Sequence, residues 1–165
     1  AISVLQFFYS IVDDFLTELD YQGWTPAHMA AFVGNLDVLR VLHAMKVDLS
    51  TLLDYAGNTL MHLAVSGKHA NVIRPLHAWE VTLDSYNDTC SNTALHIAVK
   101  VGAVEVVQVL LALGADATLL NAKGQTASTL LGQLHDKLDD SVVHQLRFLL
   151  TQANSVKEKE AVEVV

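Results

Sequence analysis

Short apolar stretches recur in pairs along this chain, separated by polar and small residues. The first member of each pair lies within the segments GWTPAHMAAFVG, GNTLMHLAVSGK and SNTALHIAVKVG. The second member carries apolar residues at three-residue spacing, as in Leu39 and Leu42, Ile73 and Leu76, and Val107 and Leu110. This spacing is typical of the buried face of a helix. The pattern therefore predicts pairs of short helices along most of the chain.

Residues at the ends of these stretches indicate where the helices begin and break. Thr25 is a good N-cap because its hydroxyl can accept a backbone amide of the first turn, and Pro26 suits the first helical position. Gly34 and Gly102 suit the break between two paired helices, because glycine adopts a positive φ at little cost. Polar residues lie near the start of the second helix, where carboxylates favour the positive end of its dipole: Asp37, Asn71 and Glu105.

The whole unit repeats when the chain is shifted by 34 residues. Residues of the first copy then meet the same types in the second: Asp20, Gly23, Thr25, His28 and Ala30 fall on Asp54, Gly57, Thr59, His62 and Ala64. A second shift reaches Asp88, Thr93, His96 and Ala98, with Ser91 where glycine stood. A fixed period of this kind is the mark of a repeat architecture.

The copies resemble ankyrin repeats, whose signature is a Thr-Pro-Leu-His-x-Ala start and a period of about 33 residues. The resemblance covers nearly the whole chain and implies an all-α solenoid of stacked helix-turn-helix units joined by β-turn or hairpin fingers. One domain, 1–153, would then contain a partial repeat at 1–19, full repeats at 20–53, 54–87 and 88–120, and a divergent capping repeat at 121–153 with a long turn around 136–140. We expect a flexible tail over 154–165, which is short and partly charged.

The N-terminal segment aligns with an outer helix that lacks its inner partner. Residues 2–19 carry only a narrow polar stripe, so apolar residues would cover most of the predicted helix. Such a helix needs burial on more than one side, since large exposed apolar patches mark interaction sites. Either further repeats precede Ala1 in a longer protein, or this segment contacts another chain, as in a dimer.

The second copy departs most from the pattern. Leu60 replaces proline, Lys68 stands where glycine is expected, and Gly67 comes one position early. Pro75 falls inside the predicted outer helix, where a proline removes one backbone hydrogen bond. We therefore expect fraying or a kink over residues 72–79, visible as faster amide exchange than in the matching run of the third copy.

Composition narrows the class of protein. Of 165 residues, 52% are hydrophobic and 17% are charged, which favours a folded core over disorder. A formal net charge of −8 disfavours nucleic acid and acidic membrane surfaces as partners. The single cysteine, Cys90, favours a reducing intracellular setting, cytoplasmic or nuclear, or a host cell if the source is a pathogen or virus. No apolar run reaches the roughly 18 residues of a membrane-spanning helix.

No arrangement of residues predicts catalysis, a metal site or a cofactor. By the resemblance, His28, His62 and His96 bond to the motif threonine and to neighbouring backbone, tying adjacent repeats together. A nucleophilic pair of Cys90 and His96 would lack a third orienting group and a free base. The remaining histidines show no pair at i, i+4 spacing and no adjacent cysteine to complete a zinc site. We therefore predict a chain that is not an enzyme.

The resemblance also implies which residues would face a protein partner, at the finger tips and the ends of the inner helices on the concave side. In the first two copies they are Tyr21, Gln22, Trp24, Phe32, Val33, Tyr55, Ala56, Asn58 and Ser66. In the third copy and the cap they are Thr89, Cys90, Asn92, Lys100, Val101, Ala122, Lys123 and Gln125.

Four of these residues are aromatic and fall in the first two copies: Tyr21, Trp24, Phe32 and Tyr55. Tyrosine and tryptophan are enriched at binding hot spots, so we interpret the four as a binding cluster. The alternative is that Trp24 and Phe32 pack on each other or on an upstream repeat. The sequence thus predicts a protein-protein interaction module, acting as an adaptor, inhibitor or effector. The alternative function is a targeting or substrate-recruitment segment of a larger enzyme or multidomain protein.

Overall fold

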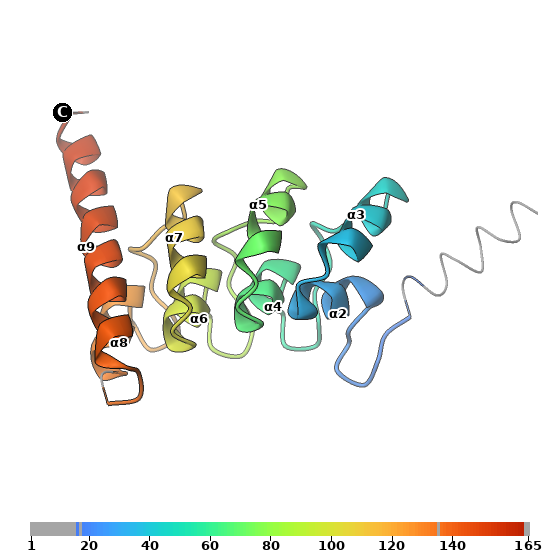
Figure 1. Ribbon diagram of the computed structural model, residues 1–165, viewed down its shortest axis with the longest axis horizontal. Coiled ribbons are helices and arrows are strands. Elements are labelled where there is room, and N and C mark those ends of the chain that lie inside the picture. The colour runs from blue at the N-terminus through green and yellow to red at the C-terminus, as the bar shows by residue number, and fades with distance from the viewer. Residues whose placement is uncertain (1–15, 17, 135, 164–165) are drawn as a thin grey trace, which may run out of the picture.

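The computed structural model describes residues 16, 18–134 and 136–163, and Figure 1 shows their helices side by side in a row. The inner helices are α2 (Pro26–Val33), α4 (Leu60–Ser66), α6 (Ala94–Lys100) and α8 (Ala127–Gln133). The outer helices are α3 (Leu36–Ala44), α5 (Ala70–Ala78), α7 (Val104–Ala112) and α9 (Asp140–Glu163). Each inner helix contacts the next inner helix, and α5, α7 and α9 contact one another in turn. The expected all-α solenoid is confirmed; an isolated bridge between Leu53 and Thr59 is the only β pairing among the described residues.

The core is one continuous apolar layer between the inner and outer rows. The apolar pairs that predicted the outer helices are all buried: Leu39 and Leu42, Ile73 and Leu76, and Val107 and Leu110. The inner helices contribute small buried residues at the matching position of three repeats: Ala30, Ala64 and Ala98. Small side chains there let neighbouring helices approach closely, as a densely packed interior requires.

Each of the first three inner helices begins with the same threonine and histidine pair. The N-caps are Thr25, Thr59 and Thr93, all in an extended backbone conformation. The threonine N–H donates to Nδ1 of the histidine three residues later, at 3.0, 3.1 and 3.3 Å. The threonine hydroxyl lies 2.9 Å from the same nitrogen in all three repeats. Thr25 is thus the N-cap of α2, as predicted, with its hydroxyl beside the His28 ring.

The turn between inner and outer helix needs one residue with a positive φ. Gly34 and Gly102 occupy this position with φ of 73° and 68°, whereas Lys68 occupies it in the second repeat with φ of 63°. Gly67 has an ordinary φ of −76°. A Cβ on Gly67 would, however, lie 2.1 Å from the carbonyl oxygen of Phe32. The close approach of α2 therefore requires glycine at 67, and a lysine takes the left-handed conformation at 68.

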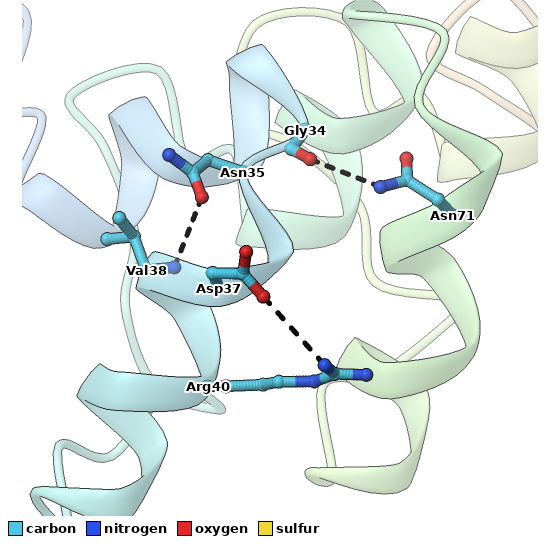
Figure 2. Close-up of polar contacts among 6 residues, drawn as sticks. All are labelled: Gly34, Asn35, Asp37, Val38, Arg40 and Asn71. Carbon is cyan, nitrogen blue, oxygen red and sulfur yellow. Dashed lines mark hydrogen bonds and ion pairs between the residues drawn. The ribbon is translucent and has the colours of Figure 1, made fainter.

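Polar residues at this turn bind the first helical turn or the neighbouring repeat, as Figure 2 shows. Asn35 caps α3 by accepting the Val38 N–H at 3.2 Å. Asn71, from the first turn of α5, donates its side-chain amide to the Gly34 carbonyl at 3.1 Å. Asp37 lies in the first turn of α3, as predicted, and its carboxylate is 3.8 Å from the Arg40 guanidinium on the exposed surface.

Residues 154–163, where the sequence predicts a tail, belong to α9; the segment contains neither glycine nor proline and is rich in strong helix formers. Pro75 lies inside α5, which has nine residues like α3 and α7, and the expected fraying over residues 72–79 stays a prediction. The outer helix expected over 2–19 lies outside the described residues, except for 16, 18 and 19.

Candidate protein-binding surface

Each finger is a tight loop closed by one side-chain carboxylate or amide. In the first finger, Asp20 Oδ1 accepts hydrogen bonds from the N–H groups two and four residues later, both at 2.8 Å. Asp54 repeats this geometry in the second finger, at 2.9 and 2.8 Å. Asn121 repeats it in the fourth, at 3.0 and 3.1 Å. Because the side chain holds the loop from inside, the residues at the tip are left facing outward.

The third finger contains one extra residue. Its closing side chain is Asn87, whose Oδ1 accepts the N–H of Asn92 at 2.9 Å, five residues later. The Asn87 N–H in turn donates to the Asn92 carbonyl at 3.1 Å. The side chain that closes the third finger thus lies one residue before Asp88, with which the expected repeat 88–120 begins. Asp88, which the alignment placed in the closing position, is an exposed tip residue.

A row of side-chain hydrogen bonds, the finger ladder, joins neighbouring fingers. In each junction the residue before the motif threonine pairs with the closing residue of the next finger. The pairs are Trp24 Nε1 to Asp54 Oδ2 at 3.1 Å, Asn87 Nδ2 to Asn58 Oδ1 at 3.0 Å, and Asn121 Nδ2 to Asn92 Oδ1 at 3.1 Å. Trp24, Asn58 and Asn92 were expected to face a partner, but their polar groups are used within the solenoid.

Asp54 is the acceptor at the centre of the first junction. Besides the indole N–H of Trp24, its Oδ2 accepts the side-chain amide of Asn58 at 3.0 Å. Burial alone would raise the pKa of Asp54, but the hydrogen bonds from Asn58, Trp24 and the Ala56 N–H outweigh it and hold the pKa below the ordinary 3.8. A charged carboxylate is thus built into the framework of the surface.

Two of the three motif histidines, His62 and His96, connect their inner helix to the next finger, whereas Nε2 of the buried His28 has no hydrogen-bond partner among the described residues. Because Nδ1 accepts the threonine N–H, we assign the ring proton to Nε2. His62 Nε2 lies 3.1 Å from the Asn92 carbonyl oxygen, and His96 Nε2 lies 2.9 Å from that of Gln125. Burial lowers the pKa of His28, His62 and His96. With both nitrogens of its ring engaged, His96 is no free base for Cys90.

The remaining expected contact residues of the first two repeats are mostly exposed. Tyr21 and Tyr55, at the finger tips, are 88% and 70% exposed, and Phe32 and Val33, at the end of α2, are 37% and 52% exposed. We call these four residues the aromatic patch. Beside it, Gln22 is exposed, whereas Ser66 is half-buried and its hydroxyl donates to the His62 carbonyl at 2.9 Å.

Contacts among finger and helix residues hold the aromatic patch together. The Tyr55 ring covers Gly23, where a Cβ would come within 2.6 Å of it. The Phe32 ring lies 5.2 Å from that of Trp24, centroid to centroid, at an interplanar angle of 50°. Trp24 itself is half-buried against the core. The packing alternative therefore applies to the pair of Trp24 and Phe32, whereas Tyr21 and Tyr55 project from the surface.

Several residues of the third repeat and the cap that were expected to face a partner also lie together, around one cavity. Thr89, Cys90, Lys100, Ala122 and Lys123 line a cavity of about 200 Å³ between the third and fourth fingers. Gln125 forms part of its wall, but it is buried and its side-chain amide donates to Gln133 at 2.6 Å. The sequence did not predict the ladder partners Asp54, Asn87 and Asn121. The sequence nevertheless carries a signal for the ladder. The residue before each motif threonine has a side chain that can donate to, or accept from, the side chain that closes the next finger.

The described residues contain neither a group of three histidine, cysteine, aspartate or glutamate side chains suited to a metal ion nor a helix long and apolar enough to cross a membrane.

No curated protein matched the chain in the sequence comparison. A sequence model of the family described as Ankyrin repeats (3 copies) matches residues 2–84, and one described as Ankyrin repeats (many copies) matches residues 81–130. The first match includes most of the segment 1–19 that we assigned to a partial repeat. The chain therefore belongs to the ankyrin-repeat family, whose repeats generally serve as modules for protein-protein interaction.

Proposed function

We propose that this chain is a non-enzymatic module that binds a protein partner on the face made by its finger tips and inner helices, with the aromatic patch as the main contact. The observation that carries the proposal is the exposure of Tyr21 and Tyr55 at adjacent finger tips. Neither side chain takes part in the finger ladder or the core. Large aromatic side chains on a rigid scaffold bury much area at low entropic cost, as binding hot spots do.

The rigidity of the surface supports the same proposal. The backbone N–H of Tyr55 donates to the Gln22 carbonyl at 3.2 Å, so the two finger tips are joined directly. Trp24 fixes the first finger to the second through Asp54 and also packs on Phe32. A preorganised surface loses little conformational entropy when a partner binds. The aromatic patch therefore needs no rearrangement before it can make contact.

Affinity capture from cell lysate, followed by titration of the purified captured protein, tests this proposal. The test variant is Tyr21→Ala/Tyr55→Ala, and the matched control is Tyr86→Ala/Phe148→Ala, which removes exposed aromatic rings outside the patch. Trp24 stays in place because it belongs to the ladder. We expect the test variant to bind at least about tenfold more weakly, since one hot-spot residue contributes about 2 kcal/mol or more, and the control to bind like the parent. Equal binding by both folded variants would refute the role of the patch.

A further inference from the structure

The cavity between the third and fourth fingers differs in chemistry from the aromatic patch. Its rim carries two lysines: Lys100, the last residue of α6, and Lys123, at the tip of the fourth finger. Both are exposed, and neither ammonium group forms an ion pair in the described part of the chain. Ala122 and Leu130 add apolar area, and Thr89 and Cys90 also line the cavity.

The charge of this cavity is opposite to that of the protein as a whole. The chain has 18 acidic and 10 basic residues, yet no aspartate or glutamate lines the cavity. Two lysines that lack ion-pair partners create a local site for a negative group in this acidic protein. Their two positive charges both attract such a group at short range. The walls are held in place by the ladder bond from Asn121 to Asn92 at 3.1 Å.

We propose that this lysine cavity binds a carboxylate side chain of the partner, so that the surface recognises an extended acidic segment with a bulky apolar residue at its other end. This inference rests on the proposed function and specifies the partner's chemistry. We choose a carboxylate because aspartate and glutamate carry the anionic side chains of an unmodified protein segment.

The spacing of the two sites sets the length of the segment. The aromatic patch lies on the first two repeats and the lysine cavity between the third and fourth, about two helix-to-helix spacings away. Packed helices lie about 8–10 Å apart, so the sites are roughly 20 Å apart. An extended chain advances about 3.3–3.6 Å per residue, which places the acidic residue about six positions from the apolar one.

Selection from a displayed library of random peptides of about twelve residues tests this inference, because that length spans both sites. The library is selected against the purified parent, against Lys100→Gln/Lys123→Gln, and against the control Lys137→Gln, whose lysine is exposed outside the cavity. We expect the parent and the control to enrich aspartate or glutamate about six positions from an aromatic or large apolar residue. The double lysine variant should lose the acidic preference and keep the apolar one.

Titration of a selected peptide then measures the contact directly. Replacing its acidic residue by the corresponding amide should weaken binding to the parent about fivefold, the upper range for one exposed ion pair, and should leave binding to the double lysine variant unchanged. A phosphoserine at that position that binds more tightly than the acid would overturn the choice of a carboxylate.

The failure of this inference is distinguishable from the failure of the proposed function. Peptides that depend on Tyr21 and Tyr55 but show no acidic preference would overturn the lysine cavity and leave the aromatic patch standing. Peptides that keep their acidic preference in the double lysine variant would overturn the cavity as the source of that preference. A library without any enriched peptide would overturn recognition of an extended segment, while capture of a folded partner through the patch could still succeed.

Discussion

The finger ladder makes a sharp prediction for Asp54→Asn, a change of one atom in the first junction. Trp24 can only donate through its indole N–H, so its partner must be an acceptor. Asp54 Oδ2 accepts from both Trp24 and the side-chain amide of Asn58. Asparagine at 54 can keep one oxygen toward the finger N–H groups, but it then turns an amide N–H toward these two donors.

The magnitude follows from the two hydrogen bonds that would be lost. A hydrogen bond to a charged group contributes about 1.5–3 kcal/mol, and the half-buried setting of these two favours the lower end. We expect Asp54→Asn to lower the free energy of unfolding by about 3 kcal/mol. The same change should cost about 1 kcal/mol less in a Trp24→Asn background. An asparagine oxygen at position 24 could accept from the new side-chain amide at position 54, as Asn58 accepts from Asn87 in the second junction.

Urea unfolding followed by circular dichroism at neutral pH measures all four proteins of this double-mutant cycle. The slope of unfolding free energy against urea should stay constant, so that the midpoints report stability alone. A loss below about 0.5 kcal/mol for Asp54→Asn would show that the ladder contributes little. Strict additivity of the Trp24 and Asp54 changes would show that donor and acceptor are not matched across the junction.

Three further predictions concern the repeats themselves. Burial lowers the pKa of the three motif histidines below 6.5, so the unfolded state binds more protons than the folded state under acidic conditions. The free energy of unfolding is therefore highest above about pH 6.5 and falls as the pH drops toward the folded pKa values. The urea midpoint should accordingly be lower at about pH 5.5 than at about 7.5, and equal midpoints would contradict this. Lys68→Gly should raise the free energy of unfolding by about 1 kcal/mol, because a φ of 63° costs a residue with a Cβ; a lower urea midpoint would contradict it. Pro75 offers no N–H to the helix, so amides over 72–79 should exchange faster than those over 106–113, and Pro75→Ala should slow them; equal protection of the two runs would count against the effect.

Much of the fold was predictable because ankyrin repeats use local signals. Thr25 and Pro26 mark a helix start, and Gly34 and Gly102 take the positive φ that their position requires. These features depend on residues within a few positions of each other. They repeat along the chain, so each copy supports the assignment of the next.

Features that depend on contacts between repeats were not predictable in the same way. The sequence offers both Asn87 and Asp88 as a closing side chain for the third finger, and only the path of the loop selects Asn87. Trp24 was interpreted as a binding residue because its type is common at hot spots. Its partner Asp54 lies 30 positions away, and that hydrogen bond assigns its indole to the framework. Exposure then separates Tyr21 and Tyr55 from the residues used in the ladder.

Hydrogen exchange of the chain with and without its captured partner tests whether the finger tips form the binding surface, since it reports which backbone amides the partner covers. We expect added protection in the finger tips at 21–24 and 55–58 and at the end of α2, where the aromatic patch lies. The outer helices α3, α5 and α7 should exchange as in the free protein. Protection confined to those outer helices, with the finger tips unchanged, would contradict binding at the finger tips and place the binding surface on the opposite side of the solenoid.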